Sequence, residues 1–286
     1  MTDSRPESAQ AACIAAVVQM VSGQNVLDNL EAAEAQIRNA AAQGAKLVVL
    51  PENFLVFDSE AAIALAQSEL ANGEPIRHRL TELSRQLEVY LVAGSLPVAQ
   101  SSSGQGSNDR RALSASLVCG PDGDVLAEYH KLHLFDVEVS GDSQRYMESD
   151  YFCQGEAPRT VDLPWGRMGL SICYDLRFPE LYREYARSGC TMLTVPSAFT
   201  AKTGEAHWDV LLRARAIENQ CFVLAPNQGG EHENGRHTFG HSQIVDPWGR
   251  VLDMIETGPG IAIAELDFKE LSQIRRRMPV EQHRRL

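Results

Sequence analysis

Apolar residues occur along this chain in two alternating patterns, short continuous runs and longer segments with apolar positions at helical spacing. The first of these segments predict a buried strand at 12–20, a helix at 26–42 and a second buried strand at 46–50. This strand, helix, strand order is typical of an α/β layer. Further strands are predicted at 89–94, 113–119, 125–130, 160–163, 168–172, 191–195, 221–225, 242–245, 250–256 and 261–266, and further helices at 60–70, 76–87, 180–187, 205–219 and 269–277.

Two predicted hairpins share the pattern P-x-G-x-V-L. One copy begins at Pro121, after strand 113–119, and the other begins at Pro247, after strand 242–245. Their separation is far longer than the repeat of a solenoid. The pattern therefore predicts two related half-layers, each a sheet covered by helices, in a four-layer α-β-β-α sandwich of the α/β class. Chance similarity between two tight turns is the alternative.

Composition and charge narrow the function classes. The chain has 286 residues, of which 44% are hydrophobic, and its net charge of -12 leaves no basic stripe for a nucleic-acid partner. No apolar run has the length of a membrane span, so no membrane partner is expected. We expect residues 1–11 to be a flexible tail and residues 12–286 to form one domain, with a polar loop at 100–109.

The six cysteines do not have the spacing of a disulfide framework or of a CxxC site. This cysteine usage favours a reducing compartment, and we expect a cytoplasmic protein. His232, His237 and His241 lie close together in sequence, but the glycines around them disfavour a helix and no cysteine pair is near. Neither a metal nor an organic cofactor is expected.

Cys173 is the first candidate for chemistry. It lies at the end of strand 168–172, at a sharp change of direction before the helix that Pro179 opens. A cysteine at the sheet edge near the positive end of a helix is expected to favour thiolate over thiol. The alternative is a small buried apolar side chain, which is the usual environment of a free cysteine.

Two charged residues follow other predicted strands. Glu52 comes directly after the apolar run KLVVLP, and Lys131 comes directly after VLAEYH. In a layered α/β fold, such strand ends converge on one rim, so both side chains are candidates for a site that includes Cys173. Taken singly, each is equally compatible with a solvated surface charge.

Three segments together resemble a known family. LPENF at 50–54, YHKLHLFD at 129–136 and ICYDLRFPE at 172–180 are similar to the motifs of the nitrilase superfamily of carbon-nitrogen hydrolases. The resemblance implies that Cys173 is the nucleophile, Glu52 the general base and Lys131 the cation that stabilises the oxyanion. It also implies an α-β-β-α sandwich that pairs through its helices, and hence a homodimer or a higher homo-oligomer.

A second glutamate after the lysine is a common feature of this superfamily. Glu148 in RYMESDYF resembles the amidase and carbamoylase motif, whereas Glu138 in FDVEV lies closer in sequence. Glu148 is preferred, with the role of holding Lys131 and positioning the substrate nitrogen. A loop carboxylate that faces water is the alternative.

The segment after Cys173 refines the expected activity. CYDLRFPELY, PSAFTAKTGEAHWDVLLRARAIENQCFV and GHSQIVDPWG are similar to the Nit amidase branch, which implies hydrolysis of the amide of deaminated glutathione to α-ketoglutarate and cysteinylglycine. Arg177 is a planar carboxylate binder and is expected to hold the α-keto acid end. The backbone N–H of Tyr174 is expected to contact the oxyanion, and Phe199 and Thr203 resemble pocket residues of the family. His207 and Trp208 are expected to open a helix and to brace the site.

Several alternative functions stay open. An ω-amidase that acts on α-ketoglutaramate would use the same catalytic residues, and an N-carbamoyl amide hydrolase or a true nitrilase would differ in its substrate. A catalytically silent binding protein is a different class, but it would have no reason to retain all three catalytic residues. A papain-like peptidase is disfavoured because Cys173 lies in mid-chain after a strand.

Overall fold

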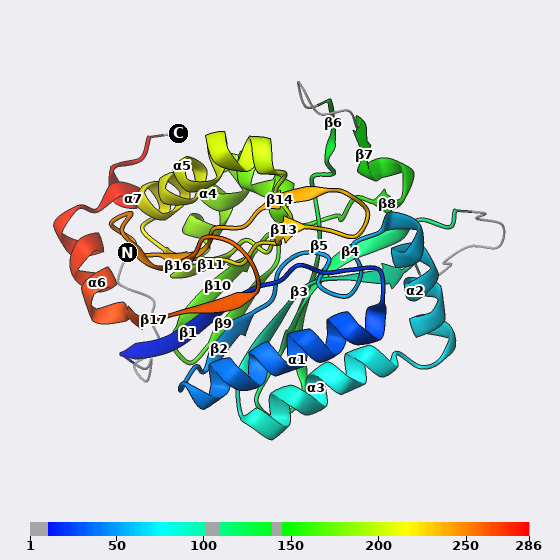
Figure 1. Ribbon diagram of the computed structural model, residues 1–286. Helices are drawn as coiled ribbons and strands as arrows, with labels where there is room; N and C mark the ends of the chain where they lie inside the picture. The colour runs from blue at the N-terminus through cyan, green and yellow to red at the C-terminus, as the bar shows by residue number, and fades with distance from the viewer. Residues whose placement is uncertain (1–10, 101–108, 139–144, 286) are drawn as a thin grey trace.

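The computed structural model describes residues 11–100, 109–138 and 145–285. Within these ranges strands and helices alternate along the chain, as the apolar pattern predicts (Figure 1). The strands are β1 (Ala12–Gln19), β2 (Leu47–Val49), β3 (Tyr90–Ala99), β4 (Ala112–Cys119), β5 (Val125–His130), β6 (Asp136–Glu138), β7 (Arg145–Met147), β8 (Phe152–Cys153), β9 (Thr160–Leu163), β10 (Gly166–Leu170), β11 (Met192–Thr194), β12 (Phe222–Ala225), β13 (Gly229–Glu231), β14 (His237–Phe239), β15 (Ser242–Val245), β16 (Val251–Ile255) and β17 (Gly260–Asp267). The α-helices are α1 (Val26–Ala42), α2 (Ser59–Ala71), α3 (Pro75–Leu87), α4 (Pro179–Arg187), α5 (Ala201–Asn219), α6 (Phe268–Arg277) and α7 (Val280–His283), and the 3-10 helices are η1 (Glu148–Asp150) and η2 (Cys173–Arg177).

Two mixed sheets form the centre of the molecule. The first has the order β17-β1-β2-β3-β4-β5, with β8 paired to β4 beside this path, and the second has the order β16-β15-β12-β11-β10-β9. In the first sheet β1, β2 and β3 are parallel to one another, and in the second sheet β10, β11 and β12 are parallel. The remaining neighbours along both paths pair antiparallel.

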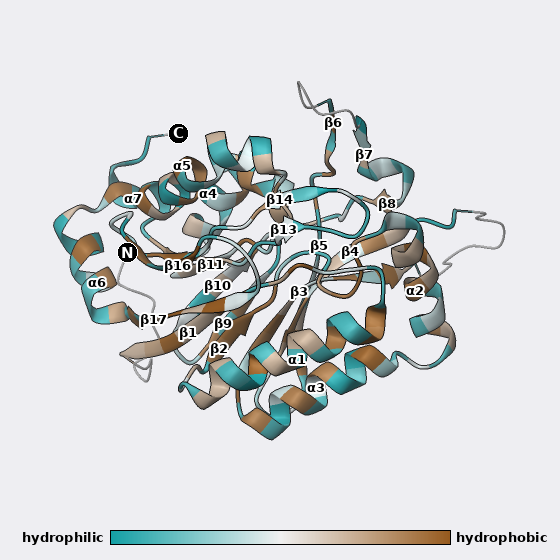
Figure 2. Ribbon diagram, in the orientation of Figure 1, coloured by the Kyte–Doolittle hydropathy of each residue, from teal (hydrophilic) through white to brown (hydrophobic). Residues whose placement is uncertain are grey.

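Alternating side chains of the first sheet explain the layering. Ala15 and Val17 of β1 belong to the core between the two sheets, together with residues of β10, β11 and β12. Ala16 and Val18 point the other way and pack with the apolar faces of α1 and α3. Helices α4 and α5 cover the outer face of the second sheet (Figure 1), and Figure 2 shows apolar strands between helices of mixed hydropathy. The predicted four-layer α-β-β-α sandwich is confirmed.

The two half-layers are related as the repeated hairpin predicts. The path β1-β2-β3-β4-β5 has the same strand directions as β10-β11-β12-β15-β16, and the hairpins β4–β5 and β15–β16 end the two paths. Both hairpins contain a register shift just before the turn. Gly123 and Gly249 hold equivalent turn positions with φ of 86° and 84°, a conformation that glycine adopts without a steric penalty. The repeated sequence pattern therefore occupies the same place in two sheets of the same strand order.

The predicted strands and helices all occur, but several boundaries differ. Strand β3 continues beyond the predicted end at residue 94, because a register shift after Ala93 lets it pair with β4 as far as Ala99. Helix α5 begins at Ala201 rather than at residue 205, because the Thr200 side chain caps it by accepting a hydrogen bond from the Thr203 N–H. His207 and Trp208 therefore lie in the second turn of α5 and do not open the helix.

Other differences concern short elements. Strands β6, β7, β8, β13 and β14, of two or three residues each, were not predicted because their patterns are too short to show a period. The predicted tail at 1–11 and the predicted loop at 100–109 lie almost entirely outside the described residues. In the described ranges no helix combines the length and the apolar character that crossing a membrane requires.

The backbone that leads from β2 to Glu52 rests on Gly94 of β3. A Cβ atom on Gly94 would lie 1.9 Å from the Leu50 carbonyl oxygen and 2.5 Å from that of Pro51. We therefore expect Gly94→Ala to lower the free energy of unfolding by roughly 2–3 kcal/mol, because the chain must shift to accept the methyl group. Chemical denaturation would measure this change.

Gly260→Ala is the matched control for this substitution. Gly260 also lies in a strand, and a Cβ there would meet nothing closer than 3.7 Å. Equal stability of the two variants would contradict the close approach at Gly94.

Candidate active site

A cavity of about 430 Å³ lies at the rim where several strands end. Glu52 follows β2, Lys131 follows β5 and Cys173 follows β10, so the three strand ends converge as predicted. The walls of the cavity include seven of the residues predicted from the sequence: Glu52, Lys131, Glu148, Cys173, Arg177, Phe199 and Thr203. Tyr174 is not among the described residues that line the cavity, and its ring packs between Phe135 and Phe178 instead.

Cys173 is the first residue of η2, at the sharp turn that follows β10. Its φ of 48° is in the left-handed region, which is uncommon for a residue with a side chain. The Cys173 N–H donates to the Pro196 carbonyl oxygen at 2.8 Å, and this bond ties the turn to the end of β11. The chain therefore holds the buried thiol in one place at the inner end of the cavity.

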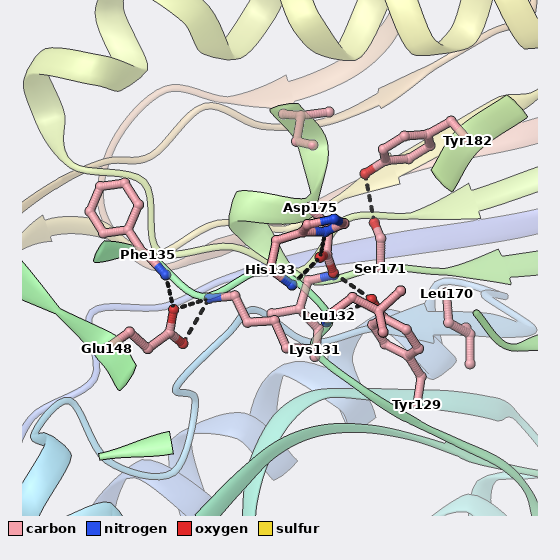
Figure 3. Close-up of polar contacts among 12 residues, drawn as sticks. Tyr129, Lys131, Leu132, His133, Phe135, Glu148, Leu170, Ser171, Asp175 and Tyr182 are labelled. Atoms are coloured by element: carbon pink, nitrogen blue, oxygen red, sulfur yellow. Dashed lines mark hydrogen bonds and ion pairs between the residues drawn. The ribbon is translucent and has the colours of Figure 1, made fainter. Parts of the chain in front are cut away.

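The Lys131 ammonium lies between two carboxylates. Its Nζ is 2.8 Å from Glu52 Oε1. It is also 2.8 Å from each carboxylate oxygen of Glu148 (Figure 3). Glu148 also accepts a hydrogen bond of 2.6 Å from the Phe135 N–H. Lys131 and Glu52 are buried, so these contacts are shielded from water.

Charge pairing in this cluster determines its protonation. Burial alone would lower the pKa of Lys131, but the carboxylates of Glu148 and Glu52 raise it well above its ordinary value. Burial raises the pKa of Glu148, against the opposing effect of Lys131. The lysine is therefore a fixed cation at the cavity wall.

The environment of Cys173 contradicts the thiolate expected from the sequence. Burial raises the pKa of the thiol well above its ordinary value, and the nearby Glu52 carboxylate raises it further. Lys131 and the Ala198 N–H oppose this shift without reversing it. The Glu52 carboxylate, which helps to keep the thiol protonated, is therefore also the neighbouring group that can accept its proton.

Asp175 links the turn of the thiol to the loop of the lysine, and it was not identified from the sequence. Its fully buried carboxylate accepts a hydrogen bond of 2.8 Å from the Ile172 N–H, beside Cys173. It also accepts hydrogen bonds from the Tyr129 hydroxyl at 2.7 Å and from the His133 N–H at 3.0 Å (Figure 3). Because Tyr129 and His133 flank Lys131, the Asp175 carboxylate fixes the turn of Cys173 relative to Lys131.

Glu52 is fixed by a second buried network that the sequence did not reveal. The Gln228 side chain donates to the Glu52 carbonyl oxygen at 3.0 Å and to the Ser22 hydroxyl at 2.9 Å. The next residue, Asn53, has a φ of 57°, and its N–H donates to the Ser95 hydroxyl at 2.9 Å. The turn that carries the Glu52 carboxylate is thus held by Gln228 from the second half-layer and by Ser95 from the first.

The two candidates for the second glutamate, Glu148 and Glu138, lie in different environments. Glu148 contacts Lys131, whereas Glu138 on β6 is largely exposed and pairs with Arg145 at 3.7 Å. The β6–β7 pairing brings Glu148 back towards Phe135 and hence towards Lys131. The geometry agrees with the preference for Glu148.

Arg177 lies at the end of η2, above two aromatic rings. Its guanidinium carbon is 5.8 Å from the Tyr174 ring centroid and 5.4 Å from that of Phe199. The His207 ring lies 3.2 Å from a guanidinium nitrogen, and Trp208 packs on Phe199 with centroids 4.7 Å apart. These contacts agree with the expectation that His207 and Trp208 brace the site.

The three histidines considered as metal ligands have separate environments. His232 is buried and stacks on Phe57 at 3.7 Å, and burial lowers the pKa of its imidazole. His237 is exposed, and His241 stacks on Phe239. Across the part of the chain that the structure describes, no cluster of His, Cys, Asp and Glu side chains has a metal-binding arrangement.

Comparison with known proteins agrees with this architecture. The model of the carbon-nitrogen hydrolase family matches residues 14–276. A deaminated glutathione amidase from Synechocystis sp. is 43% identical over 273 residues, which are 95% of this chain and 97% of that protein. A human omega-amidase is 38% identical over 94% of each chain. The crystal structure of the C. elegans NitFhit protein superimposes with a TM-score of 0.87 at 39% identity, covering 97% of this chain and 66% of that one. The chain therefore belongs to the carbon-nitrogen hydrolase family.

Proposed function

We propose that this enzyme hydrolyses the amide of deaminated glutathione, releasing α-ketoglutarate and cysteinylglycine. The observation that carries the proposal is the cluster of Glu52, Lys131 and Glu148 against the Cys173 thiol in one cavity. These groups supply a nucleophile, a base and a fixed cation, which hydrolysis of an amide through a thioester requires. The substrate is supported by the likeness to the Synechocystis deaminated glutathione amidase.

The acylation step starts from the neutral thiol. Glu52 accepts the proton from Cys173 as Sγ attacks the amide carbonyl carbon, so that a C–S bond forms and the carbonyl oxygen becomes an oxyanion. When the tetrahedral intermediate collapses, the C–N bond breaks and protonated Glu52 transfers its proton to the departing nitrogen. The amine leaves as a neutral group, and the acyl thioester remains on Cys173.

The deacylation step uses the same groups in reverse. Glu52 removes a proton from water as the water oxygen attacks the thioester carbon, and the C–S bond then breaks. The departing thiolate takes the proton back from Glu52, which restores the resting enzyme. The sum of the two steps is one water consumed and one amide cleaved.

Lys131 stabilises the negative charge that develops on the carbonyl oxygen. Two of its three contacts go to the same carboxylate, Glu148, at 2.8 Å each. One of these can be exchanged for the oxyanion while the other still orients the ammonium. We propose the backbone N–H of Tyr174 as the second donor, since it immediately follows the nucleophile.

We propose Arg177 as the group that binds the α-keto acid end of the substrate. Its guanidinium is placed by Tyr174 and Phe199 in the same short helix region as the nucleophile. A planar guanidinium binds a carboxylate with two parallel hydrogen bonds. Phe199 and Thr203 then line the acyl side of the cavity.

The alternative within this class is hydrolysis of α-ketoglutaramate, the activity that the name of the human omega-amidase relative describes. The acyl part of the two substrates is the same, so the catalytic residues do not separate them. An N-carbamoyl substrate lacks the α-keto acid that Arg177 would hold. A silent binding protein is disfavoured by the paired and buried catalytic cluster.

We further propose a cytoplasmic homodimer. The location is supported by six cysteines that are all free thiols. The dimer is supported by exposed apolar side chains on α5 and on the neighbouring β15–β16 turn, namely Val210, Ile217 and Trp248. Ile217 packs directly over Gly249 in that turn, so these side chains form one continuous surface.

Activity on the two candidate substrates tests the proposal. With release of α-ketoglutarate as the assay, we expect a higher kcat/KM for deaminated glutathione than for α-ketoglutaramate. Cys173→Ala should abolish release of product from both, because no thioester forms. Cys119→Ala, which removes a buried thiol on β4, should retain turnover. Turnover by Cys173→Ala would end the assignment of the nucleophile.

The protonation state of Cys173 gives a second test. Because the pKa of its thiol is raised above the ordinary value, the group is protonated at about pH 8, and no thiolate absorbance should be assignable to it there. The measurement is an ultraviolet pH titration of the wild type minus that of Cys173→Ala. A thiolate step below about pH 8 in this difference would contradict the proton transfer to Glu52.

The dimer is tested by molar mass in solution. We expect the wild type to have twice the mass of one chain, and Val210→Glu combined with Trp248→Glu to have the mass of one chain, because charges would replace apolar contacts. Leu27→Glu is the matched control, since Leu27 is an exposed apolar residue on α1, at the opposite face of the sandwich. Dissociation by the control variant alone would place the interface elsewhere.

A further inference from the structure

Arg236 is a second guanidinium at the wall of the catalytic cavity, in the turn between β13 and β14. Its guanidinium carbon lies 5.1 Å from the Tyr146 ring centroid and 6.0 Å from that of Phe57. A guanidinium above two aromatic rings is held by cation–π attraction, which fixes its plane. The reaction proposed above assigns no role to Arg236.

The turn that carries Arg236 is itself attached to Phe57. The His232 ring stacks on Phe57 at 3.7 Å, and the Asn234 side chain donates to the Phe57 carbonyl oxygen at 2.7 Å. Asn234 also accepts a hydrogen bond of 3.1 Å from the Arg236 N–H. These contacts place the guanidinium before any ligand arrives, so little conformational entropy is lost when it binds one.

A chain of aromatic contacts connects Arg236 with Arg177. Tyr146, beside Arg236, packs on Phe135 with centroids 5.3 Å apart, and Phe135 packs on Tyr174 at 5.1 Å. Arg177 stacks on the far ring, Tyr174. Both guanidinium groups line the catalytic cavity.

Phe135, the middle residue of this chain of contacts, is bonded through its backbone to the catalytic cluster. The Phe135 N–H donates to Glu148, which in turn holds Lys131 (Figure 3). Lys131, Arg177 and Arg236 line the same cavity, so a substrate that places its amide near Lys131 has two guanidinium groups in the cavity walls as partners for its carboxylates. Deaminated glutathione carries one carboxylate on the α-keto acid and another on the terminal glycine, with the scissile amide between them.

We propose that Arg236 binds the terminal carboxylate of the leaving dipeptide, as the counterpart of Arg177 on the acyl side. This inference rests on the proposed function and deepens it, because it names the residue that favours a dipeptide over ammonia as leaving group. Stacking occupies the faces of the guanidinium, whereas a carboxylate binds its N–H edge with two charge-assisted hydrogen bonds. α-Ketoglutaramate has no group that reaches this position.

A third arginine at the cavity, Arg145, does not meet the same conditions. It is exposed, and its nearest carboxylate partner is Glu138 at 3.7 Å, at the outer end of the β6–β7 ribbon. No aromatic stacking of Arg145 is found among the described residues. Arg145 therefore provides a matched control of the same charge.

The test compares kcat/KM for deaminated glutathione with kcat/KM for α-ketoglutaramate in wild type, Arg236→Gln and Arg145→Gln. We expect Arg236→Gln to lower the ratio of the two values by about 10- to 100-fold, since it removes a charge-assisted pair of hydrogen bonds. Arg145→Gln should change the ratio by less than about 2-fold. A deaminated glutathione analogue with a terminal carboxamide should lose rate on wild type and be insensitive to Arg236→Gln.

The outcomes separate this inference from the proposed function. Suppose that wild type hydrolyses deaminated glutathione, but that Arg236→Gln lowers kcat/KM equally for both substrates or for neither. The proposed function then survives and the role of Arg236 is refuted. If wild type hydrolyses only α-ketoglutaramate, both are refuted. Binding of deaminated glutathione to Cys173→Ala, measured by calorimetry with and without Arg236→Gln, gives the same decision without turnover.

Discussion

The structure depends on one buried ion cluster, the Lys131 ammonium between the carboxylates of Glu52 and Glu148. Removing charged groups from water is costly, and the cost is offset only while the partners remain in hydrogen-bond contact. Loss of one partner from such a buried cluster typically costs about 3–5 kcal/mol. The fold must therefore bring the ends of β2 and β5 and the start of η1 to the same place. The same constraint holds a cation beside a thiol, which is what hydrolysis of an amide needs.

The positions of the thiol and the base follow from two further buried networks. Asp175 joins the turn of Cys173 to the residues on both sides of Lys131, and Gln228 joins the turn of Glu52 to Ser22, in the loop that follows β1. Both networks cross between the two half-layers of the sandwich. They explain how Cys173, whose φ lies in the left-handed region, keeps a defined distance from the neighbouring Glu52 carboxylate.

The two half-layers have the same strand order, but they contribute differently to the site. The first half-layer and the segment that follows it supply Glu52, Lys131 and Glu148, and the second half-layer supplies Cys173, Arg177 and the loop with Phe199. The cavity therefore lies where the two halves meet, and the β13–β14 turn closes it from the second half. Loops added to a repeated frame, rather than the frame itself, provide the chemistry that distinguishes substrates.

The sequence by itself determined the strands, the helices and the repeated hairpin, because apolar period and turn glycines are local properties. It also identified Glu52, Lys131 and Cys173, since each directly follows a strand within a specific motif. It left open the choice between Glu138 and Glu148, and it did not reveal Asp175, Gln228 or Arg236, because their partners lie far away in the chain; the Gln228 contact with Glu52 spans 176 residues. The thiolate expectation was wrong for the same reason: it considered only the adjacent helix, whereas burial and a carboxylate from another strand decide the pKa of Cys173. These are contacts that only the tertiary structure creates.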